Sequence, residues 1–246
     1  MRGWLALNSE LLYWAVLAPW RGQRWSVAET FRQMVLIGVR ALPMASLVAL
    51  SIGLTLAMQS AGEMRKLGVT SYVPDLVSLS LLRELGPLLI AVIVIGRSGS
   101  SVTAELGTMK VGEEIEALEV MAINPIRFLV VPRFFAMLIM LPAITVFGDC
   151  VGIAGGWLIC RFTLDFTTPG FIQHAVDRAE PWDLYSGIIK SVVFAWITIT
   201  IACQRGLEVQ GGAEGVGSAT TQSVVWSLLM VLISNALLTG LFFFTS

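Results

Sequence analysis

The sequence predicts an all-α integral membrane protein with five transmembrane helices, and three observations support this prediction. Hydrophobic residues make up 56% of the 246 residues and charged residues only 13%, whereas a soluble domain contains roughly 25% charged residues. The mean hydropathy is +0.79. Five stretches reach the ~20 predominantly apolar residues that a helix needs to cross a bilayer. The net charge of −1 gives no reason to expect a nucleic-acid partner.

Residues 1–40 are predicted to form an interfacial amphipathic region that is retained in the mature protein. Asn8 and Glu10 interrupt the apolar stretch that would otherwise resemble a signal peptide, and no small-x-small cleavage site follows. The segment mixes tryptophans and arginines, which is typical of helices that lie along lipid headgroups. These residues are Trp4, Trp14, Trp20, Trp25, Arg2, Arg21, Arg24 and Arg32.

The remainder of the chain, residues 41–246, is predicted to be one domain of five membrane helices. The second span carries an adjacent pair of charges, Arg83 and Glu84. The third and fourth spans each carry one charge, Asp149 and Lys190, and the fifth carries Asn235 near its middle. The predicted spans are 41–62, 76–96, 134–160, 184–204 and 223–244.

Positive charges between the spans predict a cytoplasmic N-terminus and a periplasmic C-terminus. In that orientation the inside segments are 1–40, 97–133 and 205–222, which together hold ten Lys or Arg residues. The two outside loops, 63–75 and 161–183, hold four. Lysine and arginine concentrate on the cytoplasmic side of membrane proteins, so this asymmetry favours the N-in arrangement.

The charged residues within the spans are the first candidates for a functional site. A charge at the centre of a membrane helix costs about 2.5–3.5 kcal/mol on insertion scales, so these side chains should face the bundle interior or a wet cavity. Adjacent helical residues point about 100° apart, and Arg83 and Glu84 therefore need different partners. One arrangement pairs Glu84 with Lys190 and brings Arg83 to Asn235 or to a ligand. The alternative is a buried network that only fixes helix register.

Small residues predict close helix packing in the third span and a flexible loop before the fifth. Gly148, Gly152 and Gly156 recur at every fourth position, a spacing that lets membrane helices approach closely within one subunit or between two. The glycine-rich segment 211–220 lacks the lysine of a phosphate-binding loop. The three cysteines have no CxxC spacing and are interpreted as small core residues.

A short acidic helix is predicted at about residues 111–121, in the central cytoplasmic segment. Ile115 and Leu118 recur at helical spacing, acidic residues cover the other positions, and Pro125 ends the pattern. Such a helix is either a solvated loop helix that rests on the bundle or a docking element for a cytoplasmic partner. The pattern alone leaves both readings open.

Several enzyme classes lack the residues that their chemistry requires. The chain contains no GxxxxGK[ST] motif, no HExxH motif and a single histidine, His174, so neither its own ATP-binding loop nor a multi-histidine metal site is expected. The stretch GRSG around Ser98 matches the nucleophile segment of rhomboid-type intramembrane serine proteases. That reading is unfavourable, because the predicted topology puts Ser98 and His174 on opposite sides of the membrane.

One long block of the chain resembles the MlaE/YrbE permeases. The block is "LLRELGPLLIAVIVIGRSGSSVTAELGTMKVGEEIEALEVMAINPIRFLVVPRFFAMLIMLP", and the likeness continues through "GIAGGW", "IKSVVFAW" and "SATTQSVVWSLLMVL". This family provides membrane subunits of ABC transporters that work with MCE proteins in lipid trafficking. The resemblance implies an interfacial N-terminal helix, five membrane helices, and location in the bacterial inner membrane as a multi-pass protein.

The resemblance also implies partners and a ligand. The permease would form a dimer, more simply a homodimer, beneath a periplasmic MCE-protein hexamer. Two copies of a separate ATPase would bind ATP and magnesium, so this chain would need no cofactor or metal of its own and would have no catalytic residue. The transported molecule would be a phospholipid, held in a pocket between the two permeases.

Site residues follow from the resemblance position by position. Arg83, Glu84 and Lys190 correspond to polar residues of the lipid pocket, while Leu56 and Leu85 would line its apolar wall. Asn235 is a departure, because relatives often carry Asp there. The acidic helix would couple the permease to the ATPase through Glu113, Glu114, Glu116, Ala117 and Glu119.

Two other functions compete with lipid transport by an ABC permease. A proton-coupled secondary transporter could use the Arg83, Glu84 and Lys190 group as a relay, and it would need no ATPase. A scaffold that merely anchors an MCE ring would leave transport intact when Glu84 or Lys190 is replaced by alanine.

Overall fold

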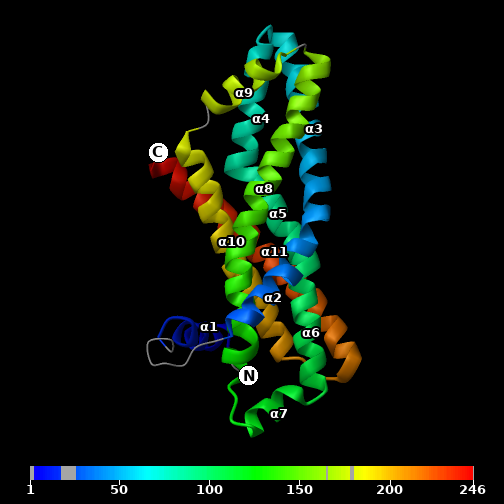
Figure 1. Cartoon of the computed structure of the whole chain (residues 1–246), viewed down its shortest axis with the longest axis vertical. Coiled ribbons are helices and arrows are strands. Elements are labelled where there is room, and N and C mark those ends of the chain that lie inside the picture. The colour runs from blue at the N-terminus through cyan, green and yellow to red at the C-terminus, as the bar shows by residue number, and fades with distance from the viewer. Residues whose placement is uncertain (1–2, 18–25, 165, 178–179, 246) are drawn as a thin grey trace. The chain divides into compact units, whose positions relative to one another are not determined.

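The computed structural model describes residues 3–17, 26–164, 166–177 and 180–245, and within these ranges every regular element is a helix. Arg2, Trp20, Arg21, Arg24 and Trp25 of the predicted interfacial region lie outside the described residues. The labelled helices (Figure 1) are α1 Trp4–Leu12, α2 Val27–Ile37, α3 Leu42–Leu67, α4 Val73–Ser80, α5 Gly86–Val94, α6 Ser100–Val111, α7 Glu114–Val120, α8 Val131–Thr163, α9 Thr168–Asp177, α10 Pro181–Leu207 and α11 Gly212–Thr245.

Five helical stretches in the described residues are long and apolar enough to cross a membrane, preceded by the short helix α1. This confirms the predicted all-α membrane class, and the chain is a multi-pass membrane protein; the orientation of its termini stays a prediction. All five stretches extend beyond the predicted spans. They are Val27–Leu67, Thr70–Val111, Ile126–Thr163, Pro181–Leu207 and Gly212–Phe244.

The second helical stretch does not end at Gly96, as predicted, but continues to Val111. A π-helical turn at Ile95–Gly99 carries the chain past its two glycines into α6. Ser98 is buried there and its hydroxyl donates a hydrogen bond to the Ile37 carbonyl at 2.8 Å. A serine engaged in this way is part of the packing and is not poised as a nucleophile.

The glycine-rich segment 211–220 was predicted to be a flexible loop, and this prediction is wrong, because α11 already begins at Gly212. The turn is confined to Gly211 and Gly212, whose φ angles of 87° and 72° suit glycine. The helix is then favoured by packing against α6, because Val216 of α11 lies close to Gly107. A β-carbon at Gly107 would be 3.4 Å from the Val216 side chain. Glycine composition alone does not reveal this contact.

The acidic helix is shorter than the predicted range 111–121. Val111 still belongs to α6, Gly112 ends that helix, and Glu113 adopts a left-handed conformation with φ of 57° before α7 starts at Glu114. The helix ends at Val120. A sharp turn at Gly112 and Glu113 therefore separates α6 from α7.

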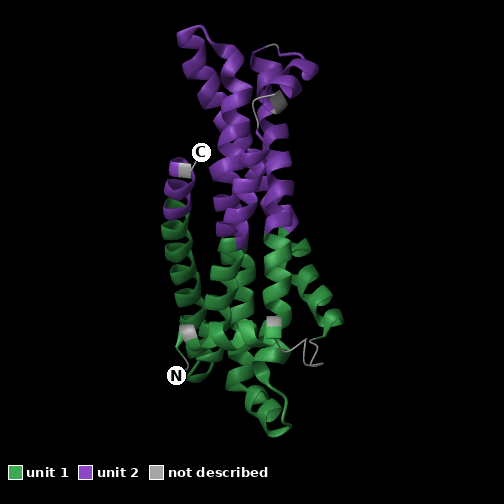
Figure 2. Cartoon of the chain, turned by 90° about the vertical axis from the view of Figure 1, so that its left-hand side faces the viewer, with its two compact units in different colours: residues 1–41, 94–141, 193–236 green, residues 42–93, 142–192, 237–246 purple. Residues whose placement is uncertain are grey.

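Contacts divide the chain into two compact units, coloured separately in Figure 2. Unit 1 contains residues 1–41, 94–141 and 193–236, and unit 2 contains residues 42–93, 142–192 and 237–246.

In unit 1 the short helix α1 is held by polar side chains that seemed out of place in an apolar segment. Asn8 is buried, its amide nitrogen donates to the Trp4 carbonyl at 2.9 Å, and its Oδ1 accepts from Trp196 Nε1 at 3.0 Å. Glu10 accepts from the Asn124 amide at 3.2 Å. These bonds explain how the N-terminal helix tolerates the residues that interrupt its apolar pattern.

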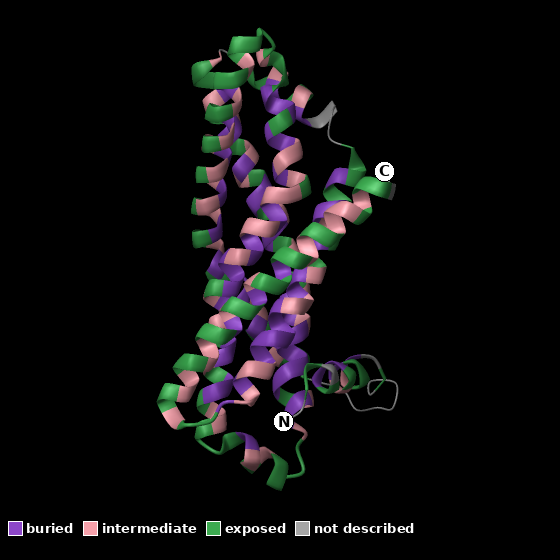
Figure 3. Ribbon diagram, turned by 180° about the vertical axis from the view of Figure 1, so that it is seen from behind, coloured by how far each residue is buried: buried purple, intermediate pink, exposed green. Residues whose placement is uncertain are grey.

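In unit 2 small residues let α3 and α8 meet at backbone distance. A β-carbon at Gly53 would overlap the Gly152 carbonyl, and one at Gly156 would meet the Val77 side chain of α4 at 2.7 Å. The glycine repeat therefore serves packing within one chain. Outward-facing residues of α3 are exposed (green in Figure 3). Cys160 is buried as predicted, whereas Cys150 is exposed on α8.

Candidate functional site

The Arg83–Glu84 pair of unit 2 lies on a π-helical turn, Leu81–Leu85, between α4 and α5. The Gly86 N–H bonds to the Leu81 carbonyl, five residues back, which is the π pattern. Pro87 follows, and proline has no N–H to give to the carbonyl four residues earlier, that of Arg83. The local sequence thus leaves a main-chain acceptor open inside an apolar helix.

Lys190 of α10 fills this open position. Its Nζ donates to the Arg83 carbonyl at 3.0 Å, to Glu84 Oε1 at 2.5 Å and to Thr239 Oγ1 at 2.9 Å. An ammonium group has three donors, so all of them are used. Lys190 is 1% exposed, and such burial is tolerable for a charge only when it is paired and hydrogen-bonded.

Glu84 completes a triangle with Lys190 and Thr239, because the Thr239 hydroxyl also contacts Glu84 Oε1 at 2.8 Å. The predicted pairing of Glu84 with Lys190 is therefore present. Thr239, on α11, was not singled out from the sequence. An isolated threonine in an apolar helix is too common to signal a site by itself.

Arg83 has a different partner from the one predicted. Its Nε donates to Asp183 Oδ1, in the first turn of α10. The Asp183 side chain is fully buried and its second oxygen accepts from the Glu180 N–H at 3.0 Å. The sequence reading assigned residue 183 to an outside loop, so Asp183 was missed. The usable signal was its spacing from Lys190, two helical turns away on the same face.

Asp183, and not Asn235, is the partner of Arg83 in the structure, and the predicted contact of Arg83 with a ligand stays a prediction. Asn235 belongs to unit 1 and is a partly exposed residue of α11. Leu56 and Leu85 belong to unit 2, where both are partly buried and pack against the core cluster around Val77, Leu81 and Phe171.

The polar residues open onto a pocket with an aromatic side. Arg83 is its most accessible charged group, with 52% of its side chain exposed. Trp182 and Phe242 meet edge to face, with ring centroids 5.8 Å apart. The pocket is lined by Arg83, Glu84, Trp182, Ser186, Lys190, Thr239, Phe242 and Phe243. A half-exposed guanidinium beside aromatic rings suits a ligand with an anionic group and an apolar part.

Close approach of α10 to the π turn is possible because residue 187 is glycine. A β-carbon there would overlap the Leu82 carbonyl oxygen. That carbonyl also lacks its π-type donor, since the N–H it would need belongs to Pro87. The contact of Gly187 with the turn brings Asp183 and Lys190 within reach of Arg83 and Glu84.

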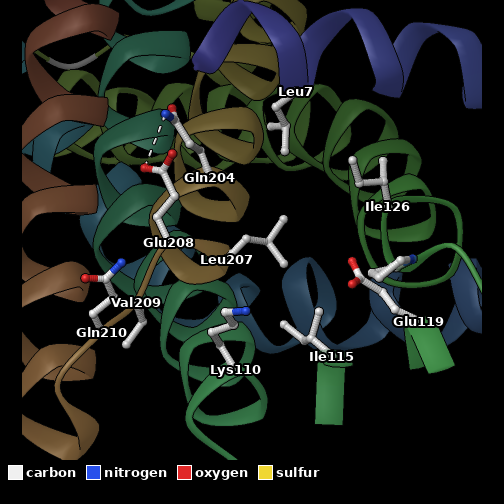
Figure 4. A pocket seen from close by; sticks show the side chains of 11 residues that line it. Leu7, Lys110, Ile115, Glu119, Ile126, Gln204, Leu207, Glu208, Val209 and Gln210 are labelled. Atoms are coloured by element: carbon white, nitrogen blue, oxygen red, sulfur yellow. Dashed lines mark hydrogen bonds between the residues drawn. The ribbon is translucent and has the colours of Figure 1, made fainter. Parts of the chain in front are cut away.

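The acidic helix α7 lies in unit 1 and presents two distinct faces. Ile115 is buried and lines a pocket together with Lys110 and Leu207, shown in Figure 4. The opposite side and the end of the helix carry exposed apolar residues, Val120 at 87% and Met121 at 60%. Glu113, Glu114, Ala117 and Glu119 are exposed as well.

Lys110 of α6 holds α7 in place through an ion pair with Glu116. The ammonium group bonds to Glu116 Oε1, and this hydrogen bond holds the pKa of the Glu116 carboxyl below its ordinary value of 4.5. Glu116 is therefore engaged within the chain, unlike the other glutamates predicted to form the docking face.

The partly buried ion pairs, the π turn and the five long apolar helices of the described residues together define a polytopic helical membrane protein with a polar site among its helices. Residues 30–241 match the family described as Permease MlaE, and the chain belongs to this family. The chain is 41% identical over 212 residues to a probable ABC transporter permease of Rickettsia prowazekii, with 86% of this chain and 82% of the relative covered.

Two further relatives carry more specific names. The intermembrane phospholipid transport system permease MlaE of Haemophilus influenzae is 36% identical over 216 residues, which cover 86% of this chain and 82% of that protein. The chloroplastic protein TRIGALACTOSYLDIACYLGLYCEROL 1 of Arabidopsis thaliana is 34% identical over 214 residues, which cover 87% of this chain and 61% of the relative. The predicted resemblance to MlaE-type permeases is confirmed.

Proposed function

We propose that the chain is the permease subunit of an ABC transporter that moves phospholipid, or a related lipid, between the inner membrane and a periplasmic MCE protein. The observation that carries this proposal is the pocket of unit 2, where the half-exposed Arg83 guanidinium lies beside Trp182 and Phe242. Membership of the MlaE family and the phospholipid transport named for the Haemophilus relative support the choice of ligand.

The chemistry of the pocket fits a lipid with a phosphate group. The Arg83 guanidinium has five N–H donors, and only its Nε–H is directed to Asp183. The others would form charge-assisted bonds to phosphate oxygens. The aromatic rings of the pocket would contact acyl chains, whereas Leu56 and Leu85 are not among the residues that line this pocket.

Energy would come from a separate ATPase, which binds ATP and magnesium and docks on α7. The chain has no P-loop motif of its own. The exposed Val120 and Met121 present an apolar surface that would fit a groove on the ATPase. The exposed Glu113, Glu114 and Glu119 would set the orientation of the docked ATPase. ATPase closure would act on the bundle through this helix.

The assembly would contain two copies of the permease, two ATPase subunits and a periplasmic MCE hexamer, with the N-terminus in the cytoplasm. For transport to be coupled, the two states of the permease must bind lipid with different free energies. A buried charge network that is dry in one state and wet in the other would supply part of that difference.

Reconstitution tests this proposal directly. Fluorescent phospholipid transfer from proteoliposomes to the soluble MCE protein should require both ATP and the ATPase, and Arg83→Ala should reduce it. Transfer driven by a proton gradient without ATP would instead support a secondary transporter. Unchanged transfer in Glu84→Ala and Lys190→Ala would support a scaffold with no lipid pocket here.

A further inference from the structure

A second acidic group of unit 2, Asp149 of α8, is buried directly behind the π turn. The residue is 3% exposed, and its Oδ1 has no hydrogen-bond partner among the described residues. Its carboxyl group packs against Gly86, where a β-carbon would overlap Oδ1 and lie 2.8 Å from Cγ. Only a glycine can follow the π turn while Asp149 occupies this position.

The surroundings of Asp149 are apolar. It lines a small pocket of about 10 Å³, at the lower limit for one water molecule, whose walls include Val48, Ile52, Leu89 and Ile90. Asp149 is the one ionisable residue among the described residues that line this cavity. Burying an ionised carboxylate without a counter-ion in such surroundings costs several kcal/mol of desolvation free energy. Burying the neutral carboxylic acid costs far less.

The charged groups of the neighbouring elements are already engaged. Segments 48–52 of α3 and 86–90 of α5 contain no charged residue, and Asp149 is the only charge of α8 between residues 134 and 160. On the π turn, Arg83 bonds to Asp183 and Glu84 to Lys190. Within the described part of the chain, none of these charged groups contacts Asp149.

We propose that Asp149 is present as a neutral carboxylic acid and acts as a positioning residue, holding Gly86 and the π turn so that Arg83 and Glu84 reach α10. Its carboxyl group fills the space that a side chain at position 86 would take. Ionisation would require either water or a shift of the turn, and either change would redirect the two charged residues of the pocket. The role of Asp149 in transport rests on the proposed function, whereas the protonation state of its carboxyl group does not.

Infrared spectroscopy of the purified protein at neutral pH tests the protonation state. The carbonyl stretch of a protonated carboxylic acid should be present in the wild type, absent in Asp149→Asn, and retained in the control Glu84→Gln, whose carboxylate is ion-paired. A wild-type spectrum without this band would overturn the proposal, even if no variant could be purified. This result is independent of lipid transport.

Lipid transfer tests the positioning role. Asp149→Asn is isosteric and neutral and should keep most of the transfer rate. Asp149→Ala should lower the transfer rate roughly tenfold or more, because a small displacement of Arg83 and Glu84 has effects of this size. In addition, transfer by the wild type should fall at alkaline pH more than transfer by Asp149→Asn. Equal losses in the Asn and Ala variants, or identical pH profiles for wild type and Asp149→Asn, would overturn the positioning role. Absence of transfer in every protein, with the infrared band present, would instead count against the proposed function.

Discussion

The Nζ atom of Lys190 lies 3.0 Å from the carbonyl oxygen of Arg83, the oxygen to which Pro87 cannot donate. A side chain from one helix therefore completes the main-chain bonding of another. The relationship links three sequence features, the proline, the charged pair and the lysine, into one structural unit. It also means that the lysine contributes to folding as well as to any binding.

Removal of Lys190 should destabilise the protein by less than the ~3–5 kcal/mol of a fully buried pair, because Glu84 loses its partner but is itself 35% exposed. The test variant is Lys190→Met, measured by thermal unfolding in detergent. The double variant Glu84→Gln, Lys190→Met should recover part of this loss, with a coupling of about 0.5–3 kcal/mol. Strictly additive effects would contradict a direct pair.

Gly187→Ala should destabilise unit 2 by about 1–3 kcal/mol, because its methyl group would force α10 away from the Leu82 carbonyl. The matched control is Gly62→Ala on α3, where no atom lies within 4 Å of the added carbon. That control should be neutral, or stabilising by up to about 1 kcal/mol, since alanine favours helix. Equal unfolding temperatures for the two variants would argue against the close contact.

Val120→Asp should weaken the proposed docking of α7 on the ATPase, because it places a charge in the exposed apolar end of the helix. The measurement is co-purification of the ATPase with the permease. Reversing Glu113, Glu114 and Glu119 to Lys should also release it, while Glu63→Lys, an exposed residue at the end of α3, serves as the control. Full ATPase retention by Val120→Asp would contradict this role for the helix end.

The attachment of α7 to α6 should depend on pH. The Glu116 carboxyl has a lowered pKa in the folded chain, so its bond to Lys110 contributes stability above the ordinary value of 4.5 and loses it as the pH falls below that value. Hydrogen exchange of residues 112–120 should therefore accelerate, after correction for intrinsic rates, as the pH is lowered through this range. In Glu116→Gln the same amides should show no such change.

Much of the membrane architecture could be predicted from the sequence, because apolar length and charge content are properties of single segments. The same holds for the Glu84–Lys190 pair, since few groups in these spans can compensate each other's charge. The extent of the second helix past Gly96 could not be predicted. It depends on buried contacts of Ser98 and Thr103 that only the packed bundle supplies.

The parts of the site that were missed share one cause. Asp183 and Thr239 acquire their roles from where α10 and α11 lie beside the π turn. The spacing of Asp183 from Lys190 puts both on one face of α10, but a single-segment pattern does not give the position of that face relative to the turn. Asp149 was recognised as an interior charge, but its contact with Gly86 was not, because the space that a glycine leaves open is visible only from the neighbouring helix.

The three donors of Lys190 are all occupied, by Arg83, Glu84 and Thr239. A phosphate that reaches this ammonium group would bind by exchange, displacing one of these acceptors, so the gain from the new bond is reduced by the loss of the old one. Arg83 has no such restriction and would make the first contact. Under the proposed function, affinity at Lys190 would then depend on how firmly Thr239 holds its place, and a movement of the C-terminal part of α11 would capture or release the headgroup.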